Sequence, residues 1–215
     1  MNILITAGST SVPIDRVRVI SNVFRGRTGA MIAAEAFTQG HTVKLLTSGA
    51  LDHDAPEGLP HRRYHTFDEL RALMAEEIQT GAYDTIIHSA AVSDYRVDKV
   101  YAAGARTIEQ RTDGKIGSSH DRLILELVPT EKLVDLIRNP WGFTGTLVKF
   151  KLQVGLTDDE LLAIARKSMA DSHADFIVAN CLEWARERAY ILDAAGGCTN
   201  VPRNDLARDL IRRIS

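Results

Sequence analysis

A glycine and two hydroxyl residues follow the first apolar run of the sequence. Residues 2–7 (NILITA) have the composition of a buried strand, and Gly8, Ser9 and Thr10 come directly after it. A turn of this kind presents free backbone N–H groups and hydroxyls, which suit the oxygens of a phosphate group. Many turns that follow a strand have the same composition, so the motif alone leaves a purely structural role open.

The distance from this turn to the next predicted helix is unusual. A dinucleotide-binding fingerprint places its glycines in one tight turn, but here roughly twenty residues intervene before the glycines Gly26 and Gly29. The missing G-x-G-x-x-G pattern argues against an ordinary NAD enzyme. The intervening segment holds polar residues that suit the lining of an enlarged pocket, namely Asp15, Arg16, Arg18, Ser21 and Asn22.

Small residues also follow a second strand candidate, residues 84–88 (DTIIH). The backbone of His88, Ser89 and Ala90 would let a ligand lie close, and Asp94 would meet a ribose or a base. The alternative is tight packing between a strand and a helix, with Asp94 as the helix cap. His88 also suits a hydrogen-bonded position in the core, and we do not expect it to act as an acid or a base.

Lysines mark two further candidate positions. Lys115 lies in the glycine-rich segment 113–119 (DGKIGSS), where a lysine is usually solvated but can also close over phosphate as a cation on a moving loop. Phe150 ends a strand candidate over residues 146–150 and either stacks on a base or closes the core. Lys149 and Lys151 alternate with it, so they point to the opposite face.

Short apolar strands alternate with amphipathic helices and must position these residues. Further strands are predicted over residues 42–47, 123–128 and 175–179 and in a late hairpin of residues 189–193 with the segment around 199; helices are predicted over residues 28–39, 66–80, 131–138, 157–172 and 204–214. Capping boxes open two of these helices, at Thr66 and Thr157. This alternation indicates an α/β fold: a Rossmann-like, doubly wound, mostly parallel sheet with helices on both faces and a long flap.

Length and composition limit the possible functions. The 215 residues suit one Rossmann-like domain over residues 1–215, in which the irregular segment 96–122 is a flap or a dimer arm. A formal net charge of -2 argues against general binding to nucleic acids or membrane surfaces. Cys181 and Cys198 form no metal-ligand pattern and suit a reducing compartment. With no signal-peptide pattern and no membrane-spanning run, we expect a cytoplasmic protein without membrane or nucleic-acid partners.

The motifs together resemble those of phosphopantothenate–cysteine ligase, the phosphopantothenoylcysteine synthetase of coenzyme A biosynthesis. The matching segments run in order from residue 3 to about residue 193: ITAGST, IDRVRVISN, GRTGAMIAAEA, HSAAVSDYR, KIGSS with LILELVPT, FKL and ADFIVAN. The spellings FKL and KIGSS look like those of the stand-alone members. Many bacterial members are instead fused to a flavin-dependent decarboxylase.

The resemblance implies a ligase that activates a carboxylate with a nucleotide. In this family the carboxylate of 4'-phosphopantothenate attacks the α-phosphate of CTP or ATP, and pyrophosphate leaves. The amine of L-cysteine then attacks the acyl carbon of the acyl-nucleotide and releases CMP or AMP. The resemblance also implies Mg²⁺ with the nucleoside triphosphate and a homodimer whose flap reaches toward the neighbouring subunit.

The resemblance assigns roles to individual residues. Asn22 matches the asparagine that holds the acyl-nucleotide, since an amide donates to an oxygen without adding negative charge. Lys115 matches the flap lysine that meets the nucleotide phosphates, so these two are the catalytic candidates. The nucleotide-binding candidates are Gly8, Ser9, Thr10, His88, Ser89, Ala90, Asp94, Lys132 and Phe150. The candidates for binding the other substrates are Asn22, Asn180 and Arg25; Arg25 is proposed from its guanidinium and not from the resemblance.

Some positions depart from the family pattern. Relatives commonly have His-Ser-Ser/Thr-Gly after the asparagine, whereas this chain has Val-Phe-Arg-Gly over residues 23–26. Arg25 can bind a phosphate with both guanidinium nitrogens, and Phe24 can narrow the pocket. Ser168 and Ser172 stand where fused members have lysines that approach the nucleotide, so another cation is needed, such as Lys151 or Lys167, or the nucleotide preference differs. A substrate-shifted or non-catalytic relative and a dinucleotide-binding oxidoreductase are the alternatives.

Overall fold

An eight-stranded sheet with the order β13-β12-β11-β10-β6-β1-β4-β5 forms the centre of the fold. The computed structural model describes residues 1–49, 56–103, 108–111 and 114–215. The strands of the sheet are β1 (Asn2–Ala7), β4 (Thr42–Thr47), β5 (His61–Arg63), β6 (Thr85–His88), β10 (Thr146–Gln153), β11 (Phe176–Cys181), β12 (Arg188–Asp193) and β13 (Cys198–Pro202). Those from β5 to β11 in the sheet order run parallel, in the Rossmann order 3-2-1-4-5-6. The predicted fold class is therefore confirmed.

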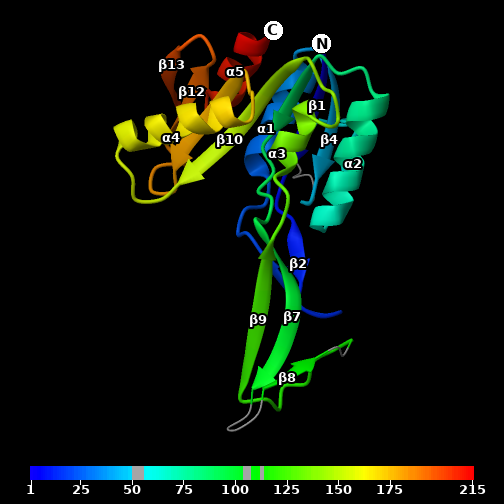
Figure 1. Cartoon of the computed structure of the whole chain (residues 1–215). Coiled ribbons are helices and arrows are strands. Elements are labelled where there is room, and N and C mark those ends of the chain that lie inside the picture. Colours follow the sequence, from blue (N-terminus) through cyan, green and yellow to red (C-terminus); the bar gives the residue numbers. More distant parts are fainter. Residues whose placement is uncertain (50–55, 104–107, 112–113) are drawn as a thin grey trace.

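Helices cover both faces of this sheet (Figure 1). Alternate residues of β1 point to opposite faces: Ile3 and Ile5 pack with α1 (Arg27–Thr38) and α5 (Leu206–Ile214). Leu4 packs with α2 (Phe67–Thr80), α3 (Leu133–Arg138) and α4 (Asp158–Asp171). Both predicted capping boxes are present, at the starts of α2 and α4. Across the described ranges, no helix has the length and apolar content needed to cross a membrane.

A long arm follows the carboxyl end of β6 and projects away from the sheet (Figure 1). It is an antiparallel sheet of β7 (Tyr95–Ala103), β8 (Ile108–Arg111) and β9 (Arg122–Pro129), with Tyr95 opposite Pro129 at its base and Ala103 opposite Arg122 near its tip. Within the segment 96–122, predicted to be irregular, residues 96–103 and 108–111 thus belong to strands. The strand predicted over residues 123–128 is confirmed as β9, although both of its faces are mainly exposed.

The residues between β1 and α1 form a second, shorter projection. β2 (Ser11–Pro13) pairs antiparallel with β3 (Val19–Ser21), and β2 lies against β7 at the arm. The backbone N–H of Ser11 donates to the His65 carbonyl at 2.7 Å, which fastens the hairpin beside the start of α2. The unusually long segment between the first strand and the first helix therefore contains a β-hairpin, formed by β2 and β3.

Candidate functional site

The carboxyl ends of β1 and β6 lie side by side and carry two of the predicted motifs. Thr6 is opposite His88 in the parallel register, so residues 8–10 and 89–94 leave the sheet as neighbours. The Ser93 N–H donates to Thr10 Oγ1 at 2.8 Å, and Thr10 Oγ1 donates to Ser93 Oγ at 3.0 Å. Between these strands the chain order along the sheet reverses, which is where open α/β sheets bind ligands. We name this region, bounded by residues 8–10 and 89–94, the strand-end crevice.

The start of α1 sits directly on the turn after β1. Gly8 and Gly26 both have positive φ, 93° and 82°, and a Cβ on Gly26 would lie 2.4 Å from the Gly8 nitrogen. Gly26 is the N-cap of α1 and provides no side-chain cap for the first-turn N–H groups. Uncapped N–H groups at the positive end of a helix dipole attract anions. The turn and the helix start therefore form one surface suited to phosphate.

Gly26→Ala is expected to lower the free energy of unfolding by about 2–5 kcal/mol, because a Cβ adds a left-handed conformation and a backbone overlap. Gly40→Ala is the matched control, since Gly40 has a φ of 85° but nothing within 4 Å of a Cβ; we expect a loss of about 1–2 kcal/mol there. Urea unfolding of both variants measures the difference. Equal losses would contradict the close contact between Gly26 and Gly8.

The second half of the hairpin insertion reaches the strand-end crevice. Asn22 Nδ2 donates to the Ala91 carbonyl at 3.1 Å, and Ser21 Oγ lies 3.0 Å from Ser9 Oγ. Asn22 is exposed, so its amide lies at the surface of the crevice. Asp15, Arg16 and Arg18, which precede β3 in the hairpin insertion, were predicted to line an enlarged pocket. They instead form the hairpin turn and contact the arm. The physical reason is that the hairpin extends along the arm.

A row of buried polar side chains crosses the sheet on the face covered by α3 and α4. Thr6 Oγ1 lies 2.9 Å from His88 Nδ1, and burial, with the nearby Lys149 charge, lowers the pKa of His88 to about 4. His88 is therefore a neutral core residue, as one of the two interpretations held. Lys149 Nζ donates to the Ser168 carbonyl and to Ser172 Oγ, both at 2.9 Å, and burial lowers its pKa.

The row of buried polar side chains contains a candidate for the cation that was expected near Ser168 and Ser172. Lys149, rather than Lys151 or Lys167, places its ammonium beside Ser168 and Ser172. Lys167 instead pairs with Asp171 at 2.7 Å on the exposed surface of α4. The predicted alternation along β10 is confirmed, because Phe150 packs against the opposite face, which α1 and α5 cover.

The remaining candidates lie around the same edge of the sheet. Phe150 was predicted to end its strand, but β10 continues to Gln153; Phe150 is half-buried and lies one residue beyond the last residue of β10 that pairs with β6. Asn180 is half-buried near the end of the neighbouring β11. Lys132 is the exposed N-cap of α3. Asp94 is exposed and precedes β7, so no helix follows it and the helix-cap interpretation is wrong. The Asp94 carbonyl accepts from the Thr130 N–H at 2.9 Å, which closes the base of the arm.

Two arginines stand near the start of α1. Arg25, a predicted substrate-binding residue, is exposed in the loop before the helix. Arg203, which the sequence reasoning missed, follows β13 and its guanidinium donates to Thr28 Oγ1 in the first turn of α1. Burial lowers the pKa of Arg203, with Arg27 nearby as a second cause. Its position at the end of a strand was the available signal, but the pairing with α1 depends on the tertiary fold.

Lys115 does not lie at the strand-end crevice of its own chain. It follows β8, which pairs with the outer half of β7 from Val100 to Ala103, and it precedes β9, which begins opposite Ala103. Lys115 is exposed. The arm carries this segment away from the central sheet (Figure 1). The structure thus groups most of the predicted residues at the carboxyl ends of the parallel strands and places Lys115 on the arm.

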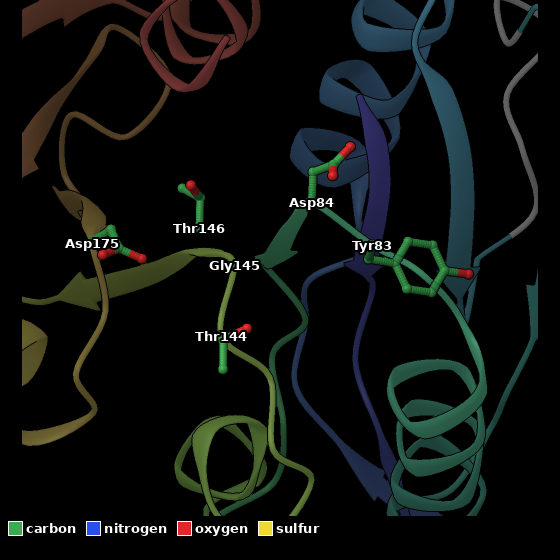
Figure 2. A pocket seen from close by; sticks show the side chains of 6 residues that line it. All are labelled: Tyr83, Asp84, Thr144, Gly145, Thr146 and Asp175. Carbon is green, nitrogen blue, oxygen red and sulfur yellow. The ribbon is translucent and has the colours of Figure 1, made fainter.

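A hollow at the amino ends of the parallel strands is not the expected ligand site. Figure 2 shows its lining around the amino ends of β6 and β10, formed by Tyr83, Asp84, Thr144, Gly145, Thr146 and Asp175. The Asp175 carboxylate is held by the Arg138 guanidinium and by the Leu147 N–H, each at 2.7 Å. Ligands of parallel α/β sheets bind at the carboxyl ends of the strands. We therefore infer that the Asp175 carboxylate stabilises the fold and does not bind a ligand.

Comparison with known proteins gives consistent matches over the whole chain. The family model "DNA/pantothenate metabolism flavoprotein C-terminal domain" matches residues 1–215. The coenzyme A biosynthesis bifunctional protein CoaBC of Thermococcus kodakarensis is 32% identical over 217 residues, which cover 99% of this chain but 49% of that protein. The chain therefore spans about half the length of this relative.

Solved structures resemble the chain in fold as well. The DNA/pantothenate metabolism flavoprotein from Streptococcus pneumoniae matches with a TM-score of 0.87 at 32% identity, over 100% of this chain and 98% of that one. The Cab2 mutant H337A, described as a complex with phosphopantothenate-cysteine, matches with a TM-score of 0.72 at 17% identity, over 99% and 84%. The latter likeness shows the fold alone.

Proposed function

Because the chain belongs to the family of the DNA/pantothenate metabolism flavoprotein C-terminal domain, we propose that it ligates 4'-phosphopantothenate to L-cysteine in coenzyme A biosynthesis. The observation that carries this proposal is the strand-end crevice, where the turn after β1, the uncapped start of α1 and the Asn22 amide converge. A relative named for coenzyme A biosynthesis and a similar fold described with phosphopantothenate-cysteine support it.

The proposed reaction has two steps at one site. A carboxylate oxygen of 4'-phosphopantothenate attacks the α-phosphorus of CTP or ATP, and the bond to pyrophosphate breaks. The amine of cysteine then attacks the acyl carbon, loses a proton, and the nucleoside monophosphate leaves with the former carboxylate oxygen. Uncapped N–H groups of α1 and the turn at residues 8–10 bind phosphate oxygens, Asn22 donates to the acyl-nucleotide, and Phe150 lies against the base.

Mg²⁺ is proposed to enter with the nucleotide. Within residues 1–49, 56–103, 108–111 and 114–215, no three His, Cys, Asp or Glu side chains gather in a way that could hold a metal ion. Magnesium with nucleotides commonly takes phosphate and water oxygens plus only one or two carboxylates. Asp94 was predicted from the sequence to meet a ribose or a base; because this carboxylate is exposed at the crevice, we propose that it would instead contact the ion. When bound, the ion neutralises charge on the phosphates.

The function is tested by following pyrophosphate. Purified protein is incubated with phosphopantothenate, Mg²⁺ and either CTP or ATP, with and without cysteine. We expect sustained pyrophosphate release with one nucleotide in the presence of cysteine, and a limited burst without it because the acyl-nucleotide stays bound. Absence of pyrophosphate with both nucleotides would contradict the proposal, and nucleotide binding without release would indicate a non-catalytic relative. We also propose that the protein acts in the cytoplasm.

We further propose a homodimer in which the arm of one subunit completes the site of its partner. Large apolar side chains are exposed on the arm and on the hairpin beside it, and such patches mark interfaces; they are Val19, Ile20, Tyr95, Leu123, Ile124 and Leu127. Val23 and Phe24, next to Asn22, are exposed as well. The position of Lys115 on the outer arm fits a role in the partner's crevice rather than in its own.

Mixing two inactive variants tests the shared site. In a heterodimer of Lys115→Ala with Asn22→Asp, one crevice has both functional residues and the other has neither. Random exchange at equal concentrations makes about half of the dimers mixed, so we expect recovery of about a quarter of the wild-type rate in a two-fold symmetric dimer. Pyrophosphate release measures it. No recovery after confirmed subunit exchange would mean that Lys115 serves the crevice of its own chain.

A further inference from the structure

The turn of the hairpin insertion grips the arm on both sides of Lys115. The Arg16 N–H donates to the Gly114 carbonyl at 2.9 Å. The Arg18 guanidinium donates to the Ile116 carbonyl at 2.8 Å, and the Ile116 N–H donates to the Asp15 carboxylate at 3.1 Å. The backbone before and after Lys115 is therefore bound to residues about a hundred positions earlier, while the lysine itself is exposed.

Asp15 is the centre of this contact. Its side chain has no solvent exposure. One carboxylate oxygen accepts the N–H groups of Val17 and Arg18, at 2.9 and 2.8 Å. The other accepts the Arg18 guanidinium and the Ile116 N–H. We name the contact between residues 15–18 and 114–116 the Asp15 latch.

The charge of the latch persists over the working pH range. The Arg18 guanidinium, with the Val17 N–H as the next cause, holds the pKa of Asp15 well below its ordinary value. A depressed folded-state pKa gives stability that is fully present above the ordinary carboxyl pKa and is lost only as the pH falls further into acid. The latch therefore does not open near neutral pH. The buried side chain of Ile116, 3% exposed, anchors the same segment.

We propose that Asp15 is a positioning residue for Lys115. Its carboxylate binds the Ile116 N–H after the lysine and holds Arg18, which binds the Ile116 carbonyl, while the neighbouring Arg16 N–H holds the Gly114 carbonyl before the lysine. The arm therefore presents the ammonium in one place before the nucleotide binds. An ordered backbone avoids the loss of entropy that a free loop would suffer on closing over the phosphates. This inference rests on the proposed function, in which Lys115 meets the nucleotide.

A double-mutant cycle separates positioning from general stability. Asp15→Asn keeps one oxygen for the turn but turns an NH₂ group toward the Ile116 N–H and the Arg18 guanidinium. We expect kcat of pyrophosphate release to fall about tenfold in the wild-type background and not to fall further in the Lys115→Ala background. Equal losses in both backgrounds would overturn the proposal. Arg18→Lys, which loses the planar fork, is the second variant if Asp15→Asn does not fold.

A matched control exists on α5. Asp209 and Arg212 form a pair with the same spacing of three residues, at 3.3 Å, outside the proposed site. Asp209→Asn removes an ion pair of the same type, and we expect unchanged kcat in both backgrounds. A tenfold loss in this control would show that any broken pair lowers the rate, and the proposal would fail.

Hydrogen exchange tests the latch without any activity. In the wild type we expect a protected Ile116 amide, and in Asp15→Asn a rise in its exchange rate of at least about tenfold, with β1 and β6 unchanged. Equal exchange in both proteins would show that Asp15 does not hold this segment. If the wild type releases no pyrophosphate, the proposed function fails, whereas this measurement still decides whether the latch exists.

Discussion

Lys115→Ala is expected to lower kcat for pyrophosphate release by on the order of 10²–10³-fold, the loss typical of removing one preorganised charge donor. Negative charge grows on the leaving pyrophosphate during attack by the carboxylate. An ammonium beside it therefore binds the transition state more strongly than the bound substrate, so kcat falls more than KM rises. Steady-state pyrophosphate assays with saturating phosphopantothenate and cysteine give both constants.

The control for this substitution lies on the same arm. Lys99 is on β7, and its ammonium lies 3.7 Å from carboxylate oxygens of both Asp98 and Glu126. Lys99→Ala removes a lysine from the arm without touching the segment 114–116, and we expect wild-type kcat. A normal rate for Lys115→Ala would remove Lys115 from the mechanism, and equal losses in both variants would point to damage of the arm.

Asn22→Asp is expected to lower overall turnover by on the order of 10²-fold or more. The Asn22 amide donates to the Ala91 carbonyl at 3.1 Å, whereas a carboxylate there would face that oxygen and the phosphates of the acyl-nucleotide. Two like charges about 4 Å apart in partly screened surroundings repel by about 4 kcal/mol, enough for such a loss. Rapid-quench assays of pyrophosphate and of the final product show which step slows.

Asn2→Asp is the matched control for the added charge. Asn2 Nδ2 also donates to a carbonyl, that of Ala82 at 3.0 Å, but at the amino end of β1. This variant creates the same repulsion between a carboxylate and a carbonyl on the far edge of the sheet, so it should cost stability and leave turnover unchanged. Wild-type turnover in Asn22→Asp would reject the role of Asn22 in holding the intermediate.

The sequence predicted the central sheet well because its strands are buried on both faces. Apolar runs such as residues 42–47 coincide with β4, and the capping residues Thr66 and Thr157 mark the starts of α2 and α4. In the arm, the sequence predicted only β9, as the strand over residues 123–128, and it missed β7 and β8. The first five residues of β7 are exposed or half-buried and include the charged Arg96, Asp98 and Lys99, so no buried apolar run marks this strand.

Much of the candidate site followed from one rule, that ligands lie at the carboxyl ends of parallel strands. That rule requires only the order of strands and turns, and it selected residues 8–10 and 88–94, which the structure brings together at the ends of β1 and β6. The position of Lys149 beside Ser172 and the latch between Asp15 and Ile116 depend on which distant segments pack together. No local spacing carries that information, so the polar hairpin residues were assigned to the wrong contact.

An oxygen-transfer measurement tests the central proposal most directly. Phosphopantothenate labelled with ¹⁸O in its carboxylate is converted with cysteine, Mg²⁺ and the active nucleotide. Mass spectrometry then measures the ¹⁸O content of the nucleoside monophosphate and of pyrophosphate. Attack of the carboxylate on the α-phosphorus followed by acyl transfer predicts one ¹⁸O in the nucleoside monophosphate and none in pyrophosphate. An unlabelled monophosphate, or ¹⁸O in inorganic phosphate, would contradict an acyl-nucleotide intermediate and with it the proposed ligase mechanism.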